Sequence, residues 1–288
     1  MINTRQVHLH LIFLVIAFHF LFPGNAKAKM KRAEKKNKVE FLFIEWRDKE
    51  NQLLLGHYEN KSKKIIDIKC SPETLTDAQL QTWLKGDKAI LLFHCMWGQQ
   101  SWFHKVKYLN TFDELFESSS SNDVVVISFL WHAGSVNYKS NWDKSFDKGK
   151  SLSAVLQRIN QFYAGNTSVL CHSMGSRFFE GALNDHSISP AFKEVILFSS
   201  DISSNTADPG FVSIMNSAKQ ISIFKHRKDK MLLFSSRIHG ENRIGRTGPV
   251  PEAGNINVYD MTDHIHGFQN HAHVNRRWAK EQLKKLLQ

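Results

Sequence analysis

The sequence predicts an α/β fold with a mostly parallel sheet, an antiparallel hairpin at its N-terminal end, and helices on both faces. Short apolar runs such as 88–93 (KAILLF) and 124–129 (VVVISF) have the composition of strands that are buried on both sides. They alternate with longer segments of helical spacing, as is typical of a parallel sheet. Because 42% of the 288 residues are hydrophobic, we expect a folded domain rather than a disordered chain.

Each element has its own local signal. Segments 39–46 and 52–58 predict the hairpin, because only a short polar turn separates them. A third strand is expected at 64–69, and a helix at 74–84 after Pro72. The other predicted strands are short and apolar: 88–93, 124–129, 167–170, 195–198, 220–225 and 256–259. The other predicted helices are longer segments with helical spacing: 101–117, 147–164, 174–185 and 275–287.

Residues 1–28 are interpreted as a secretory signal peptide. Arg5 supplies the positive charge, Leu11 to Phe22 is apolar apart from His19, and residues 26–28 (AKA) offer the small side chains that signal peptidase requires. The alternative is a retained membrane anchor. It is less favoured, because this run at about 1.5 Å per residue is shorter than a hydrocarbon core of about 30 Å. We therefore expect an exported protein, periplasmic or secreted if the source is bacterial.

The positive charge is concentrated near the N-terminus. Of the formal net charge of +11, residues 1–28 carry Arg5 and Lys27, and residues 29–38 (KMKRAEKKNK) carry six cations and one acid. Residues 39–288, the predicted folded domain with all the strands and helices named above, therefore carry only +4. We interpret 29–38 as a flexible basic linker, with weak contact to an anionic surface as the alternative. Nucleic acid is not an expected partner, because the linker lacks interleaved aromatic residues and no nucleic-acid-binding motif occurs in the sequence.

A candidate nucleophile follows the strand at 167–170. Cys171-His172-Ser173-Met174-Gly175 has the pattern small-x-Ser-x-Gly and leads into a helical segment. In such a strand-to-helix turn the serine is exposed at the sheet edge, and the flanking positions are small because the helix passes close to the strand. Ser173 is therefore the predicted nucleophile, with an ordinary turn serine as the alternative.

An oxyanion site is predicted beside this serine. The first amides of the following helix lie at the positive end of its dipole, so the Met174 N–H is one expected donor. The second is expected from the loop after the strand 88–93, from the amide of Cys95 or Met96.

A base and an acid are expected downstream. Asp229 follows the strand at 220–225, and His271 follows the strand at 256–259. Because parallel strands end at one edge of the sheet, Asp229 and His271 are predicted to complete a Ser-His-Asp triad. Asp201 is kept as the alternative acid and His273 as the alternative base.

Other chemistry is less favoured. The nearby histidines do not have the spacing of a known zinc motif, so no metal is expected, although a metal site formed by this cluster remains the alternative: His264, His266, His271 and His273. No phosphate-binding glycine loop is present, so no cofactor is predicted. Cys95 and Cys171 are expected to be reduced packing residues, with oxidation of the pair as the alternative.

The chain resembles the α/β-hydrolase superfamily, and within it a bacterial group of uncharacterised α/β-hydrolases catalogued as a domain of unknown function. Four segments carry the resemblance: Phe93-His94 with its strand, Val124 to Trp131, Cys171 to Ser176, and Lys228-Asp229-Lys230 with the later Ser235 to Gly240 and Arg243 to Arg246. The resemblance implies a hydrolase that uses Ser173, Asp229 and His271. The sequence departs from the common pattern at Cys95, where His-Gly is usual, and at Cys171, where Gly or Ala is usual.

These observations predict an exported serine hydrolase that acts on a small-molecule carboxylic ester through an acyl-enzyme. Amidase, thioesterase or lipase-like use of the same residues is the alternative within enzymes. A non-catalytic binding protein of the cell envelope with the same fold is the alternative from another class.

Overall fold

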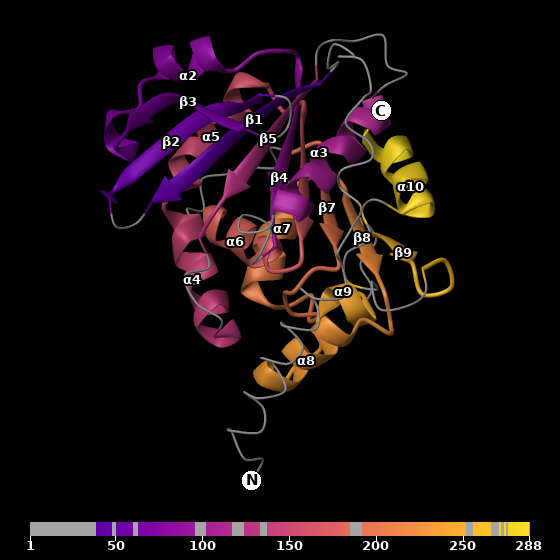
Figure 1. The fold of residues 1–288 in the computed structure, drawn as a ribbon. Coiled ribbons are helices and arrows are strands. Elements are labelled where there is room, and N and C mark those ends of the chain that lie inside the picture. The colour runs from indigo at the N-terminus through magenta and orange to yellow at the C-terminus, as the bar shows by residue number, and fades with distance from the viewer. Residues whose placement is uncertain are drawn as a thin grey trace. The chain divides into compact units, whose positions relative to one another are not determined.

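The computed structural model describes residues 39–47, 50–59, 63–95, 102–116, 124–132, 137–184, 192–251, 256–265, 271, 274 and 276–287. Within these residues the chain forms a nine-stranded sheet of order β3-β2-β1-β5-β4-β6-β7-β8-β9 (Figure 1). The strands have the following bounds: β1 (Glu40–Arg47), β2 (Gln52–Glu59), β3 (Lys63–Cys70), β4 (Lys88–Phe93), β5 (Val124–Leu130), β6 (Thr167–His172), β7 (Glu194–Phe198), β8 (Ile221–Lys225) and β9 (Ile256–Asp260). Each predicted strand is present.

The sheet is mostly parallel, as predicted. Antiparallel pairing is confined to β1–β2 and β2–β3, the N-terminal hairpin and its third strand. The pairings from β1 through β5, β4, β6, β7 and β8 to β9 are all parallel. The predicted α/β class with an N-terminal antiparallel hairpin is therefore confirmed.

Helices cover both faces of the sheet. The described helices have the following bounds: α2 (Asp77–Trp83), α3 (Trp102–Phe116), α4 (Tyr138–Lys150), α5 (Ser153–Phe162), α6 (Gly175–Ala182), α7 (Pro209–Ser217), α8 (Lys230–His239), α9 (Ile244–Thr247) and α10 (Arg277–Leu287), with a short 3₁₀ turn at Pro72–Thr74. One buried cluster joins the sheet to α2, α5, α6 and α7, and a second joins the opposite face to α3 and α10.

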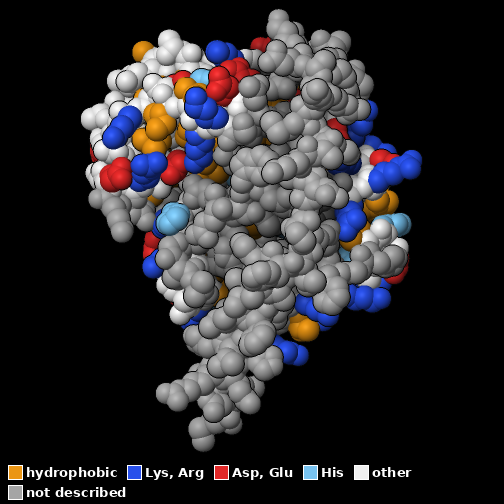
Figure 2. Space-filling model, in the orientation of Figure 1, with side chains coloured by type: hydrophobic (Ala, Val, Ile, Leu, Met, Phe, Trp, Pro, Cys, Tyr) orange, Lys and Arg blue, Asp and Glu red, His pale blue; other side chains and the backbone are white. Residues whose placement is uncertain are grey.

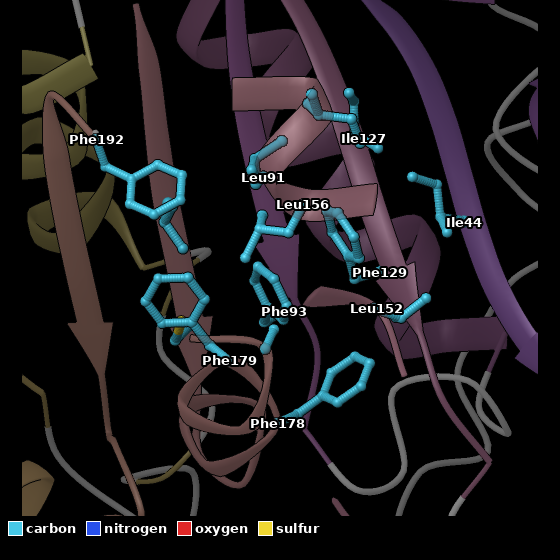
Figure 3. Close-up of a cluster of buried hydrophobic side chains, with 14 of the residues drawn as sticks. Ile44, Leu91, Phe93, Ile127, Phe129, Leu152, Leu156, Phe178, Phe179 and Phe192 are labelled. Carbon is cyan, nitrogen blue, oxygen red and sulfur yellow. The ribbon is translucent and has the colours of Figure 1, made fainter. Parts of the chain in front are cut away.

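The side-chain alternation of β4 shows how the two cores are separated. Leu91 and Phe93 belong to the first cluster, whereas Ile90 and Leu92 belong to the second, because successive strand residues point to opposite faces. Figure 3 shows Phe93 among the aromatic rings of α6. Its ring centroid lies 5.0 Å from that of Phe179. This packing fixes α6, and with it the turn that precedes the helix, against the end of β4.

The predicted helix at 147–164 is wrong in its bounds. The chain forms two helices there, α4 from Tyr138 and α5 from Ser153. The buried residues of α4 are Asn141, Ser145 and Gly149, a stripe of small and polar residues that hydrophobic spacing does not reveal. Gly149 permits close packing on α6, because a Cβ at this position would lie 2.1 Å from the Phe178 carbonyl oxygen.

The surface drawn in Figure 2 has basic and acidic side chains interspersed over its coloured part. Charged side chains of β1, β2 and β3 form ion pairs across this part of the sheet, among them Lys64–Glu45 at 2.5 Å and Lys63–Glu59 at 3.6 Å. In the described part of the chain, no helix has both the length and the apolar character needed to span a bilayer.

Candidate active site

The predicted site residues follow the carboxyl ends of neighbouring parallel strands. Ser173 follows β6, Asp201 comes after β7, and Asp229 lies four residues beyond β8. The register pairs His172 with Phe198 and Phe198 with Phe224, so these strands end at the same edge (Figure 1). Ligands of open parallel sheets bind at this edge.

Ser173 occupies a tight turn between β6 and α6. Its φ is +55°, a left-handed conformation that is uncommon for a residue with a side chain. Two backbone hydrogen bonds hold it there: the Ser173 N–H donates to the Phe198 carbonyl at 3.1 Å, and the Asp201 N–H donates to the Ser173 carbonyl at 3.2 Å. The end of β7 and the loop that follows it therefore hold the backbone of Ser173 in this conformation.

Gly175 lets the helix begin directly after this turn. A Cβ at Gly175 would lie 2.2 Å from the Phe93 carbonyl oxygen and 2.7 Å from that of His94. No side chain fits at these distances, so the small residue two positions after Ser173 is a steric requirement. Cys171, two positions before it, is fully buried, and burial raises the pKa of its thiol well above the usual range.

Ser173, His271 and Asp229 form a continuous hydrogen-bonded series. The His271 Nδ1 atom lies 2.8 Å from Asp229 Oδ2, and His271 Nε2 lies 2.8 Å from Ser173 Oγ. A carboxylate only accepts, so Nδ1 carries the proton and Nε2 is left to accept from the serine hydroxyl. This tautomer is the one that a general base beside a serine requires.

Asp229 has two separate partners for its two carboxylate oxygens. Oδ1 accepts the Leu232 N–H at 3.0 Å and so caps the N-terminus of α8, while Oδ2 faces His271. The side chain is fully buried. The helix cap fixes the carboxylate plane and leaves one oxygen directed at the imidazole.

The charge of Asp229 changes the protonation of His271. Burial by itself disfavours the imidazolium, but the charge of Asp229 and its hydrogen bond outweigh burial, and the pKa of His271 is raised above its ordinary value. A raised pKa makes the imidazole a stronger base toward Ser173. The His271 side chain keeps 20% exposure, so this base is accessible from solvent.

Two of the predicted oxyanion donors, Met174 and Cys95, are among the described residues. Met174 directly follows Ser173 and is the N-cap residue of α6. The backbone of residues 93–94 touches the first turn of α6 at Gly175, and the Trp131 indole N–H donates to the His94 carbonyl at 3.2 Å. Cys95 follows this anchored segment. Met96, the other predicted donor, lies outside the described residues.

Asp201, the alternative acid, lies in a different set of contacts. Its Oδ1 accepts from Ser235 Oγ at 2.5 Å and lies 3.5 Å from Arg243 Nε, and its Oδ2 accepts from the Tyr138 hydroxyl. Arg243 is fully buried and also donates to Glu241 Oε1 at 2.9 Å. Burial raises the pKa of Asp201 to about 6, although Arg243 and the Ser235 hydrogen bond act in the opposite direction.

The sequence was compared with models of known protein families. A family model described as an alpha/beta hydrolase of unknown function (DUF900) matches residues 73–280. The chain belongs to this family. The resemblance predicted from the sequence is thereby confirmed at the level of the superfamily and of its uncharacterised group. A search of curated proteins found no match.

The matched range of this hydrolase family contains all the candidate-site residues named above, and also the Arg243-Ile244-Gly245 segment. Gly245 packs directly on the loop after β7: its N–H donates to the Ser200 carbonyl at 3.0 Å, and a Cβ there would lie 2.2 Å from the Ser200 nitrogen. The segment therefore supports the loop that in turn holds Ser173. This segment carries part of the family resemblance, but its sequence pattern does not indicate this supporting role.

The remaining predicted residues are distributed as follows. His264 stacks on the Trp278 ring with 4.5 Å between centroids. His266 and His273 lie outside the described residues, as do the predicted signal peptide and basic linker. Among the described residues, no group of three His, Cys, Asp or Glu side chains is arranged to hold a metal ion. Cys95 and Cys171 are not bonded to each other.

A cavity of about 380 Å³ lies at the opposite edge of the sheet. It is lined in part by Glu40, the first residue of β1, and by the paired His57 and Asp67. Because β1 runs parallel to β5 and through it to β4 and β6, the beginning of β1 is at the edge far from Ser173. This cavity is therefore separate from the candidate active site.

Proposed function

We propose that this α/β hydrolase is a serine esterase that cleaves carboxylic esters through an acyl-enzyme intermediate. The observation that carries the proposal is the hydrogen-bonded series of Ser173, His271 and Asp229, with 2.8 Å at each contact of the imidazole. These distances lie within the range in which a base takes a proton from a nucleophile.

In the first half of the reaction, Ser173 Oγ attacks the ester carbonyl carbon while His271 Nε2 takes the hydroxyl proton. Asp229 stabilises the imidazolium that forms, because its carboxylate is fully buried and directed at Nδ1. The C–O bond to the alcohol then breaks, and the imidazolium returns its proton to the leaving alkoxide. In the second half, water attacks the acyl-enzyme with the same base, and the acid and free Ser173 are released.

The negative charge that develops on the carbonyl oxygen needs donors during both halves. We assign this role to the Met174 N–H and to an amide of the segment after β4, either Cys95 or Met96. Met174 lies at the start of α6, where unpaired amides and the helix dipole favour a negative charge. Loss of one such donor in other hydrolases costs about 10² to 10³ in rate.

Covalent labelling tests the proposal directly. The purified protein is incubated with a fluorophosphonate, and the adduct is located by peptide mass spectrometry. We expect a label on Ser173 that is lost in Ser173→Ala and strongly reduced in His271→Ala, with the fold of both variants intact by circular dichroism. A well-folded protein that takes up no label would contradict the enzyme and support the non-catalytic binding protein instead.

The leaving group is tested next, because amides, thioesters and esters use the same residues. Matched acyl donors that differ only in the leaving atom are compared by kcat/KM. Ester cleavage by the wild type that exceeds amide cleavage and disappears in Ser173→Ala supports the esterase. A preference for the amide or the thioester would replace it with an amidase or a thioesterase.

We also propose that residues 1–28 direct export and that 29–38 form a basic linker in the mature protein. The sequence features that support this are the apolar run ending before Pro23 and the small residues before Lys29. Fractionation and N-terminal sequencing after expression in a bacterial host test export: a mature N-terminus near Lys29 supports it, and an intact cytosolic chain contradicts it. Contact of the linker with an anionic surface predicts salt-sensitive binding to anionic vesicles that deletion of 29–38 abolishes.

A further inference from the structure

Two buried histidines hold the chain segment that carries His271. His172 is the last residue of β6, and its Nε2 atom lies 2.8 Å from the His271 carbonyl oxygen. His226 is the first residue after β8, and its Nε2 atom lies 2.9 Å from the Ile265 carbonyl oxygen. Both side chains are about 1% exposed. Because a carbonyl oxygen only accepts, each histidine donates from Nε2.

His226 also organises the turn that carries Asp229. Its Nδ1 accepts the Lys228 N–H at 3.2 Å, and its own carbonyl accepts the Asp229 N–H at 3.0 Å. Since Nδ1 accepts and Nε2 donates, the ring is fixed in one tautomer. One side chain thus connects the turn with Asp229 to the segment that leads toward His271.

His172 contacts His271 more directly. The two ring centroids lie 5.3 Å apart, and the His172 ring centroid also lies 6.4 Å from that of Phe198 on β7. The His172 ring therefore packs against both the end of β7 and the base, with its Nε2–H directed at the backbone of His271. The adjacent residue along the chain is Ser173, so the two partners in proton transfer are both positioned by the end of β6.

We propose that His172 and His226 are positioning residues for His271, each holding one carbonyl of the segment that carries the base. The inference rests on the proposed Ser173–His271–Asp229 mechanism. An imidazole that must reach Asp229 and Ser173 at 2.8 Å on both sides tolerates little movement of its backbone. The two carbonyl contacts, made from the ends of β6 and β8 on either side of β7, fix that backbone while leaving the ring free to transfer a proton.

The test measures the second-order rate constant of fluorophosphonate labelling in the full chain. His172→Leu removes the donor at similar size, and His172→Gln keeps a donor. We expect labelling of Ser173 to slow by about 100-fold in His172→Leu, the effect of displacing a reacting group by about 1 Å, and to recover most of its rate in His172→Gln. The same comparison applies to His226, with a smaller loss expected because Ile265 is farther along the chain from the base.

A pH profile separates positioning from a general loss of structure. If His172 positions the base, His172→Leu also weakens the contact of His271 with Asp229, so the half-point of the labelling profile moves down toward 6.5, the ordinary histidine value. Leu156→Ala is the matched control, because Leu156 is fully buried in the core between α5 and the sheet (Figure 3) and takes part in none of the side-chain hydrogen bonds of the triad. It should lower stability but keep both the labelling rate and the pH half-point.

Each outcome has a distinct meaning. Wild-type rate and profile in a folded His172→Leu protein would overturn the positioning role while leaving the serine hydrolase intact. If His172→Leu does not fold, His172→Asn decides, because its shorter amide does not reach the His271 carbonyl: slow labelling supports the inference and wild-type labelling overturns it. Absence of labelling in the wild type itself would reject the proposed function.

Discussion

The two carboxylates that follow β7 and β8 make an informative comparison. Asp201 and Asp229 are both fully buried at the same edge of the sheet. Asp229 has one oxygen on His271 and the other on the N-terminus of α8, whereas Asp201 is surrounded by Ser235, Arg243 and Tyr138. Position after a parallel strand brings a carboxylate to the site, but its partners decide what it does there.

The two carboxylates also differ in the pKa that each one changes. Asp229 acts on a titratable partner and raises the pKa of His271. Asp201 is the group whose own pKa is raised, to about 6, because burial outweighs the buried Arg243 beside it. We infer that Asp229 serves the chemistry and that Asp201 holds the loop that supports Ser173.

The largest expected effect comes from exchanging each carboxylate for its amide. Asp229→Asn keeps the helix cap but no longer fixes the His271 tautomer, so kcat/KM should fall by about 10⁴ if the protein follows the serine-protease precedent. Asp201→Asn should cost less than about tenfold, because Asp201 makes no hydrogen bond to the base. Steady-state ester hydrolysis measures both variants. A larger loss in Asp201→Asn would reverse the roles assigned to the two residues.

The next effect concerns stability. Arg243→Gln removes the only cation within 4 Å of Asp201 among the described residues. Removing one member of a buried ion pair costs about 3 kcal/mol, so we expect a loss of this order in the free energy of unfolding at pH 8. Urea denaturation at pH 8 and pH 5 measures it.

The pH dependence of that loss has a defined sign. The folded protein binds the Asp201 proton more tightly than the unfolded chain, because the pKa rises from 3.8 to about 6. The associated stability is present at low pH and is lost as pH rises between these values. Arg243→Gln raises this pKa further, so its cost should be smaller at pH 5, where Asp201 is protonated, than at pH 8. An equal cost at both pH values would show that the pair with Asp201 is not what Arg243 contributes.

A smaller effect is expected on the titration of His271. With a pKa raised above 6.5, His271 contributes stability below that value, which is lost as pH rises through the folded pKa. Nuclear magnetic resonance of the His271 ring protons in Ser173→Ala should give a midpoint above 6.5. Adding Asp229→Asn should lower it, because the charge of Asp229 and its hydrogen bond are what raise this pKa, whereas adding Asp201→Asn should change it less. The reverse order would contradict the assignment of Asp229.

The sheet and the three residues of the series could be predicted because their signals are local. Continuous apolar runs identify strands, parallel pairing brings their ends together, and the small-x-Ser-x-Gly turn identifies Ser173. Asp229 was predicted as the acid, and Asp201 stayed the alternative because it also follows a strand. The partners that distinguish the two carboxylates could not be predicted: one oxygen of Asp229 caps α8, and that helix was not predicted, although Gly240 ends it in a left-handed conformation with φ +71°.

The helix α7 and the contacts of two buried histidines were not predicted, because their sequence signals are ambiguous or absent. Asp208-Pro209-Gly210 resembles a turn, but Asp208 caps α7 and Pro209 occupies its first position. His172 and His226 carry no motif of their own, since a buried histidine that donates to a distant carbonyl has no sequence pattern. The carbonyl contacts of His172 and His226 span 99 and 39 residues of chain, respectively, and only the fold creates them.

The smallest effect separates two adjacent serines of α8. Ser235 Oγ donates to Asp201 and accepts from Arg243 Nε at 3.0 Å, whereas Ser236 Oγ is buried and has no partner among the described residues. Ser235→Ala should lower the free energy of unfolding by about 1 to 3 kcal/mol, because it leaves buried charged groups short of one hydrogen bond. Ser236→Ala, the matched control, should change it by less than about 0.5 kcal/mol. Neither should alter kcat by more than a small factor, because neither serine touches the triad. Equal costs for the two variants would mean that the contacts of Asp201 contribute little to the fold, and the contrast between the two carboxylates would then rest on Asp229 alone.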